Sequence, residues 1–146
     1  MSILLRLMAE DAADLDIIAA AAQDGLVRLG DVAFDAKARR FTVSFNRFRW
    51  ESAGEDGPYE RVRSALSFES VLGVRSRKVR QGAPDALAAI LSLTFEPAVE
   101  PPAGRVRMLL AGGGEIELEV ECLDALLVDL GPSWRTPRRP DHENAS

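Results

Sequence analysis

The sequence predicts an α+β fold dominated by antiparallel strands, about seven to nine of them, with one helix near the N-terminus. Two observations indicate this. Residues 104–122 form two amphipathic segments around a glycine triplet, the pattern of a β-hairpin. Only residues 11–24 show long helical periodicity, whereas most other apolar residues alternate with polar ones. We therefore expect a curved sheet, a sandwich or an open barrel, with the helix covering one face or one end.

The predicted hairpin defines a core face and a charged face. From Glu115 to Cys122, glutamates alternate strictly with apolar residues, as in a half-buried strand. A three-residue loop, Gly112-Gly113-Gly114, keeps the apolar residues of both strands on one side. This register pairs Leu110 with Ile116, Met108 with Leu118, Val106 with Val120, Arg107 with Glu119 and Arg105 with Glu121. We favour a solvated glutamate face with cross-strand ion pairs over a metal site, because carboxylates spaced along one strand do not converge on one ion.

The helix follows a short predicted strand at residues 3–8. Asp11 is a suitable N-cap, because its carboxylate can accept hydrogen bonds from the first free backbone amides. Gly25 fits the C′ position after the last turn. The apolar face consists of Leu15, Ile18, Ala19 and Ala22. Because this face is narrow and rich in alanine, we expect the helix to lie close against a sheet.

The other elements follow from alternation and turn residues. Predicted strands cover residues 26–34, 40–50, 59–72, 74–80 and 87–95, with a turn at 36–39 and loops at 52–58 and 97–104. Residues 123–130 fit either a short C-terminal helix or a last strand, since periodicity cannot decide over so short a run.

The predicted strand at residues 40–50 contains an irregularity. Two sets of large apolar residues fall on opposite sides, Phe41, Val43 and Phe45 against Phe48 and Trp50. Either both faces of this strand are covered, or a β-bulge near Asn46 and Arg47 shifts the alternation. We favour the bulge, which would turn Arg47 and Arg49 outward.

The length suits a single α+β domain, which we place at residues 1–135. Residues 136–146 are charged and rich in proline, which predicts a disordered C-terminal tail. Residues 61–66 resemble residues 105–110, and each segment follows a strand with a similar step. The similarity fits a pseudo-repeat of two β-units, and it also fits chance likeness between amphipathic strands.

Composition excludes several kinds of site. A single cysteine excludes an internal disulfide, and one cysteine with one histidine excludes the usual zinc sites. No apolar run approaches the length of a membrane span, and the N-terminal residues lack the features of a signal peptide. We therefore expect a cytoplasmic protein with no metal, no cofactor and no membrane partner. The net charge of −5 hides an asymmetry, because residues 28–80 carry +5 and the remainder carries −10.

No catalytic constellation emerges from the sequence. His142 lies in the predicted tail, so no catalytic triad can be built around it in the core. Cys122 shares the parity of the apolar residues of its strand, which indicates a small buried hydrophobe rather than a nucleophile. The glycine triplet leads into a strand and offers no helix N-terminus to a phosphate. The sequence therefore favours a protein that is not an enzyme.

Arginines are the strongest remaining signal. Three i, i+2 pairs lie on consecutive predicted strands: Arg47 with Arg49, Arg61 with Arg63, and Arg75 with Arg77. If their faces coincide, they form an anion- or partner-binding patch beside the aromatic residues Phe48, Trp50 and Tyr59. The alternative, which we favour, is that these arginines pair with carboxylates of the same chain.

Three functions stay open at this point. The first is a non-enzymatic interaction or regulatory module that binds a protein or an anionic ligand through an arginine-bearing strand face. Nucleic acid fits this function less well, because the total charge is negative. The second is a small-ligand carrier or an enzyme with a pocket near Asn46, Trp50 and Tyr59. The third is a self-associating structural protein, so the oligomeric state is open.

Two segments carry a family resemblance. One is Gly112-Gly113-Gly114-Glu115-Ile116-x-Leu118-x-Val120-Glu121-Cys122-Leu123-Asp124-x-x-Leu127-x-Asp129-Leu130, with Trp134 following. The other is Arg39-Arg40-Phe41 leading to Asn46-Arg47-Phe48-x-Trp50-Glu51. Across Leu5 to Trp134 the chain resembles a small bacterial family, the domain-of-unknown-function family 2948. The resemblance implies one full-length domain in a bacterial cytoplasm, and it implies no activity, substrate or site.

Overall fold

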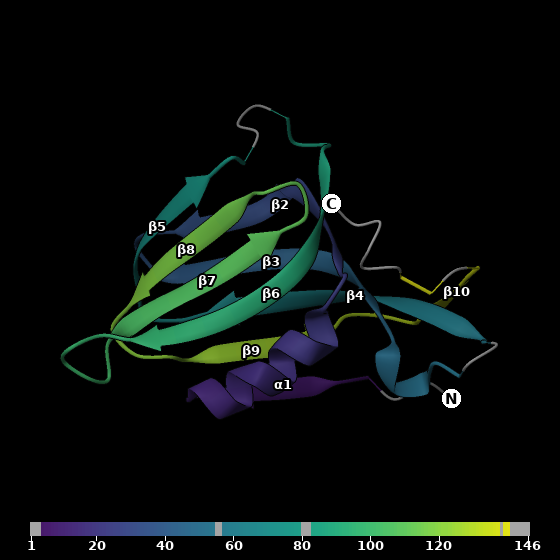
Figure 1. Ribbon diagram of the computed structural model, residues 1–146, viewed down its shortest axis with the longest axis horizontal. Helices are drawn as coiled ribbons and strands as arrows, with labels where there is room; N and C mark the ends of the chain where they lie inside the picture. The colour runs from purple at the N-terminus through teal and green to yellow at the C-terminus, as the bar shows by residue number, and fades with distance from the viewer. Residues whose placement is uncertain (1–3, 55–56, 80–82, 138, 141–146) are drawn as a thin grey trace.

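The computed structural model describes residues 4–54, 57–79, 83–137 and 139–140. These residues form one α-helix, one 3₁₀ turn and ten strands (Figure 1). The predicted class, α+β with mainly antiparallel strands and one N-terminal helix, is confirmed. The elements are β1 (Arg6–Ala9), α1 (Ala12–Ala22), β2 (Leu26–Asp35), β3 (Arg40–Phe48), η1 (Trp50–Ser52), β4 (Tyr59–Phe68), β5 (Val71–Arg77), β6 (Leu87–Pro97), β7 (Gly104–Leu110), β8 (Glu115–Val120), β9 (Ala125–Asp129) and β10 (Trp134–Thr136).

The described strands form one antiparallel sheet that folds over on itself. The strand order is β1-β9-β4-β3-β2-β6-β7-β8-β5, and β10 pairs with the start of β4. Figure 1 shows β5, β8, β7 and β6 in front of β2, β3 and β4, with α1 along the lower side. The two layers join where the start of β2 pairs with the start of β6. One apolar core fills the space between the layers, and helix α1 packs onto β6, β1 and β3.

Helix α1 begins as the sequence predicts and ends differently. The Asp11 carboxylate caps it by accepting the Asp14 amide at 2.8 Å. The buried side chains belong to the predicted face. Asp24, rather than Gly25, adopts the left-handed backbone after the helix, with a φ of 61°. Gly25 is required for space instead, because a Cβ there would lie 2.6 Å from Cδ2 of Phe45.

The β7–β8 hairpin has the predicted core face and a different register. Met108 lies opposite Ile116, and Arg107 lies opposite Glu117 rather than Glu119. The three loop residues are 111–113, closed by the Leu110 amide donating to the Gly114 carbonyl at 2.8 Å. The predicted register is therefore wrong by two residues. A shift of two keeps the same side chains facing the core, so alternation alone could not distinguish the two registers.

The predicted bulge near Asn46 and Arg47 is also wrong. Strand β3 pairs with β4 without interruption from residue 41 to residue 48. Its alternation therefore continues, so Arg47 points into the core while Phe48 is buried on the outer face. The alternative, a strand covered on both faces, holds only at its end, where Trp50 and Tyr59 cover Phe48, while Thr42 and Ser44 on the same outer face are half-buried. The register shift lies in β2 instead, between Val27 and Val32.

The C-terminal part of the chain resolves one open alternative. Residues 125–129 form strand β9, which is paired on both sides, with β1 and with β4. Cys122 is only half-buried, because β8 ends at Val120 and Leu123 takes the core position. Thr136 of the predicted tail belongs to β10, whereas residues 138 and 141–146 lie outside the described residues. The similar segments 61–66 and 105–110 lie in β4 and β7, and their duplication stays a prediction.

Candidate interaction site

Arg47 lies inside the molecule at the end of the core. Its Nε and Nη2 atoms donate to the two carboxylate oxygens of Asp129 at 3.0 and 2.8 Å. Its Nη1 and Nη2 atoms donate to Glu51 at 2.9 and 2.8 Å. The Ser64 hydroxyl and the Leu5 amide also donate to Asp129, at 2.7 and 2.9 Å. The network therefore joins β3, β4 and β9 to η1 and to the chain entering β1.

Arg47, Asp129 and Glu51 are all ionised near neutral pH. Burial would raise the pKa of Asp129, but the hydrogen bonds from Arg47, Leu5 and Ser64 outweigh burial and hold this pKa below its usual value. Burial and the Arg47 hydrogen bonds act on Glu51 in the same opposed way, and its pKa is lowered. Burial would lower the pKa of Arg47, yet the two carboxylates raise it above its ordinary value. The guanidinium stays protonated, and its N–H groups engage both carboxylates. The cluster therefore clamps β3, β9 and η1 together.

Arg49 is taken up by neighbouring carboxylates. Its Nη1 atom lies 2.6 Å from Glu60 Oε1, and its Nε atom lies 3.6 Å from Glu51 Oε2. The Ser133 hydroxyl donates to the other oxygen of Glu60 at 2.9 Å. The first predicted arginine pair, Arg47 with Arg49, is therefore engaged by carboxylates of the same chain.

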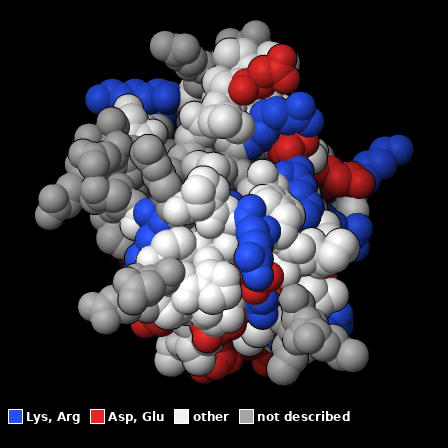
Figure 2. Space-filling model, turned by 90° about the vertical axis from the view of Figure 1, so that its right-hand side faces the viewer, with Lys and Arg blue, Asp and Glu red and all other residues white. Residues whose placement is uncertain are grey.

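The three predicted aromatic residues gather on the outer face of β3 and β4. Phe48 is fully buried there, with ring centroids of Trp50 and Tyr59 at 4.5 and 6.0 Å. The guanidinium of Arg61 lies 5.7 Å from the Phe48 ring centroid. Burial lowers the pKa of Arg61, and the nearby carboxylate of Asp24 opposes this shift. Figure 2 looks onto this end of the molecule, where basic and acidic side chains lie across a surface that is mostly uncharged.

Arg61 and Arg63 stay at the surface, held by neutral and acidic partners. Arg61 donates to the Asn46 carbonyl at 3.0 Å. Arg63 lies 2.7 Å from Asp31 and donates to the Asn46 side-chain oxygen at 3.3 Å. The hydrogen bond from Arg63, followed by that from Arg28, lowers the pKa of Asp31. Asn46 therefore orients the second arginine pair.

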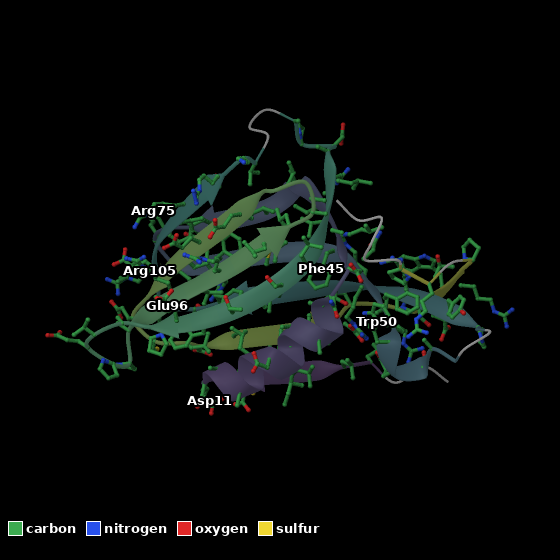
Figure 3. The ribbon with its side chains drawn as sticks, in the orientation of Figure 1. Asp11, Phe45, Trp50, Arg75, Glu96 and Arg105 are labelled. Carbon is green, nitrogen blue, oxygen red and sulfur yellow. The ribbon has the colours of Figure 1, made fainter. Side chains whose placement is uncertain are left out.

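The third arginine pair lies in the other layer. Arg75 and Arg77 belong to β5, and Figure 3 places Arg75 at the opposite end of the molecule from Trp50. The six arginines therefore do not share one face. The structure separates them into a buried pair, a half-buried pair beside the aromatic residues and an exposed pair on an end strand of the sheet.

The layer of β1, β9, β4, β3 and β2 has an uncharged middle on its outer side. The strand register brings uncharged residues of neighbouring strands side by side in this area. Ala65 lies between Val128 and Ser44, and Leu126 lies beside Met8. Arg6, Arg61 and Arg63 border this area, together with Asp35 and the ion pair of Arg40 with Glu69. We call it the neutral face, and it consists of Met8, Ala33, Thr42, Ser44, Ala65, Ser67, Leu126 and Val128.

The outer side of the other layer carries balanced charges instead. Across its strands, Glu96 lies opposite Arg105, which lies opposite Glu119, and Arg107 lies opposite Glu117. The glutamates of β8 form cross-strand ion pairs with arginines, as predicted, but the arginine that each glutamate pairs with differs from the prediction. Arg107 Nε lies 2.8 Å from Glu115, and Arg105 Nη1 lies 3.4 Å from Glu117.

Two parts of this site, Asp129 and the neutral face, are not among the residues expected from the sequence. Asp129 shares the parity of Ala125 and Leu127, and an acid at a buried parity signals a buried cation. Leu126 and Val128 complete the unbroken apolar run of residues 125–128. Such a run is typical of a strand whose two faces both contact apolar groups. That continuity is the signal for the neutral face.

Three hollows lie away from the pocket that was predicted near Asn46, Trp50 and Tyr59. Their lining residues include Leu29 and Leu110 in one, Leu72 and Val99 in another, and Arg75 with Glu117 in the third. None of these three is lined by Asn46, Trp50 or Tyr59. Within the described residues, no three His, Cys, Asp or Glu side chains are placed to hold a metal ion. No helix in the described part of the chain is long and apolar enough to cross a membrane.

Comparison with protein families gives a match. The model of the family described as protein of unknown function (DUF2948) matches residues 5–142. Searches among curated proteins and among solved structures found no match. Because the matched region covers nearly the whole chain, the protein belongs to the DUF2948 family.

Proposed function

We propose that this protein is a non-enzymatic interaction module that binds a partner protein through its neutral face. The observation that supports the proposal is the contrast between the two layers. One outer face matches charges with opposite charges across the strands, whereas the other has an uncharged middle with charged residues only at its border. A patch of this kind, apolar in the middle and polar at the rim, is typical of a protein-binding surface.

The side chains of the neutral face suit a flat partner. Met8 is 61% exposed, and Leu126 and Val128 are half-buried beside it. Covering such groups yields roughly 25 cal/mol per Å² of apolar surface. The small residues on β3 and β4 let a partner approach the sheet closely. Arg6 at the rim, which lies opposite Val128, favours a partner with a carboxylate beside an apolar centre.

We also place this module in the cytoplasm, as the single cysteine suggests. Fractionation of cells with an antibody to the chain tests this location. Recovery from the periplasm or the culture medium would contradict it.

Site-specific photocrosslinking in the native host tests the proposed function. A photoreactive amino acid replaces Ala65 on the neutral face, and the matched control replaces Thr94 on the charged outer face. We expect a discrete adduct from position 65 and none from position 94. The double variant Leu126→Glu/Val128→Glu, whose fold is checked by circular dichroism, should abolish the adduct. Equal adducts from both positions, or none from position 65, would overturn the proposal.

Two measurements separate the competing functions. An adduct of twice the chain mass, together with a dimer in light scattering, would assign the neutral face to self-association instead. Salt-dependent binding of heparin or single-stranded DNA, lost in Arg61→Glu/Arg63→Glu and retained in Arg105→Glu/Arg107→Glu, would assign it to a polyanion. We expect neither result.

A further inference from the structure

A hollow of about 250 Å³ lies beside the place where β2 and β6 join the two layers. We call it the β2–β6 hollow. Figure 1 shows the turn between β7 and β8 beside β6 here, and that turn forms part of the rim. The walls are mostly apolar and include Leu29, Val79, Leu87 and Leu110, with three alanines beside them.

Backbone hydrogen bonds fix the walls of this hollow. The Leu29 amide donates to the Ala86 carbonyl at 2.9 Å on one side. On the other side, the Ala111 amide donates to the Ala89 carbonyl at 2.8 Å. Because the main chain holds both walls, the hollow exists before a ligand arrives, and a ligand does not have to order it.

The glycine loop of the β7–β8 hairpin leaves the rim of the hollow bare. Gly112 and Gly113 both have a φ of 91°, and a Cβ on Gly112 would meet no atom within 4 Å. A Cβ on Gly113 would lie 3.7 Å from Cδ of Lys78. The stem of Lys78 therefore runs beside the loop, at a position where the loop has no side chains.

Lys78 brings the only charge to the described lining of the β2–β6 hollow. Within the described ranges, none of the ion pairs involves this lysine. Glu115, which follows the loop, is engaged by Arg77 and Arg107 instead, at 3.5 and 2.8 Å. A single ammonium, without the forked guanidinium that suits phosphate, matches one negative charge.

We propose that the β2–β6 hollow binds a small monocarboxylate with an unbranched apolar tail. The tail lies against Leu29, Leu87 and Leu110, and the carboxylate meets the ammonium of Lys78. The volume equals that of about eight water molecules at roughly 30 Å³ each, so the tail is short. The proposal goes beyond the function above, because no lining residue of the hollow belongs to the neutral face.

The chain has only two lysines, Lys37 and Lys78, and they provide the readout of the test. Reductive methylation of the full chain with carbon-13 formaldehyde labels both lysines and keeps their charge. The probe is sodium octanoate, titrated below its micelle concentration while NMR follows the two dimethyl-lysine signals. Acetate supplies the charge without the tail, and octan-1-ol supplies the tail without the charge.

We expect octanoate to shift the Lys78 signal along a saturable curve and to leave the Lys37 signal in place. Acetate and octan-1-ol should bind at least about tenfold more weakly, because each lacks one half of the recognition. Equal shifts of the two lysine signals, or a shift that does not saturate, would overturn the proposal. Equal binding of acetate would overturn it as well.

Two variants and their matched controls locate the site. Saturation-transfer NMR of the octanoate methyl group measures affinity in every variant, and circular dichroism checks each fold. Lys78→Gln, which removes the charge, and Ala111→Leu, which fills the hollow, should each weaken binding at least about tenfold. Lys37→Gln and Ala98→Leu, the same changes at an exposed turn and in a different hollow, should leave it unchanged. Unchanged affinity in Lys78→Gln, or in a folded Ala111→Leu chain, would overturn the proposal.

Discussion

Arg47 and Asp129 lie 82 residues apart in the sequence and form an ion pair with a 2.8 Å distance from Nη2 to Oδ2, with both side chains fully shielded from solvent. The pair joins an inner strand position of β3 to the end of β9, and Glu51 holds the same guanidinium from η1. This relationship turns the first predicted binding residue into a structural one.

Asp129→Ala should destabilise the protein by about 3–5 kcal/mol, because it leaves the buried Arg47 charge without one of its two carboxylates. The matched control is Glu69→Ala, which breaks the exposed ion pair of Glu69 with Arg40. Exposed pairs contribute only about 0–1 kcal/mol. Urea unfolding followed by tryptophan fluorescence measures both free energies. Equal losses in the two variants would contradict a clamping role for the buried pair.

The free energy of unfolding should fall with acid more steeply in the native chain than in Asp129→Asn. The folded-state pKa of Asp129 is lowered, so its stabilising contribution is present above the unfolded pKa of about 3.9. That contribution is lost as the pH falls through the folded-state pKa. Urea titrations at a series of pH values from neutral downward give the two slopes. Parallel curves would show that Asp129 does not contribute to the acid sensitivity.

Gly25→Ala should destabilise the chain by about 1–3 kcal/mol, the usual cost of overpacking. The new Cβ would lie 2.6 Å from the Phe45 ring and 2.9 Å from the Ala22 carbonyl oxygen. Gly131→Ala is the control, because no atom lies within 4 Å of a Cβ built there. The melting temperature of Gly25→Ala should be clearly lower than that of Gly131→Ala. An unchanged melting temperature in Gly25→Ala would contradict the close contact of the α1–β2 junction with β3.

A double-mutant cycle should detect the hairpin register. Arg107 and Glu115 form an ion pair, so alanine replacements at the two positions should show a coupling energy of about 0.2–1 kcal/mol. The same cycle between Arg107 and Glu119, the pair of the alternative register, should show none. Coupling in the second cycle and its absence in the first would restore the register predicted from the sequence.

Phe48→Ala should cost about 3–5 kcal/mol, as for a buried aromatic residue, although Phe48 faces away from the main core. It should also expose Trp50, whose ring centroid lies 4.5 Å away. A red shift of the Trp50 emission in a Trp134→Phe background measures that change. An unshifted spectrum with a small loss of stability would mean that this outer cluster contributes little.

Local patterns were enough to predict the fold class and the positions of most elements. Helix α1 has both its cap and its face in the sequence, because capping and 3.6-residue periodicity involve neighbours a few residues apart. The parity of β7 and β8 was predicted for a similar reason. Their register was not, because two pairings two residues apart bury the same side chains and only the backbone geometry of the loop separates them.

The direction in which each arginine points depended on contacts between distant strands. The sequence by itself determined a single amphipathic helix, alternating strands and a block of arginines on three of them. Tertiary structure alone decided that Arg47 turns inward to Asp129, that Arg61 and Arg63 border an uncharged face, and that Arg75 and Arg77 end the sheet. The physical reason is that a buried charge is tolerated only beside its counter-charge. Here the counter-charge of Arg47 is Asp129, which lies 82 residues later in the sequence.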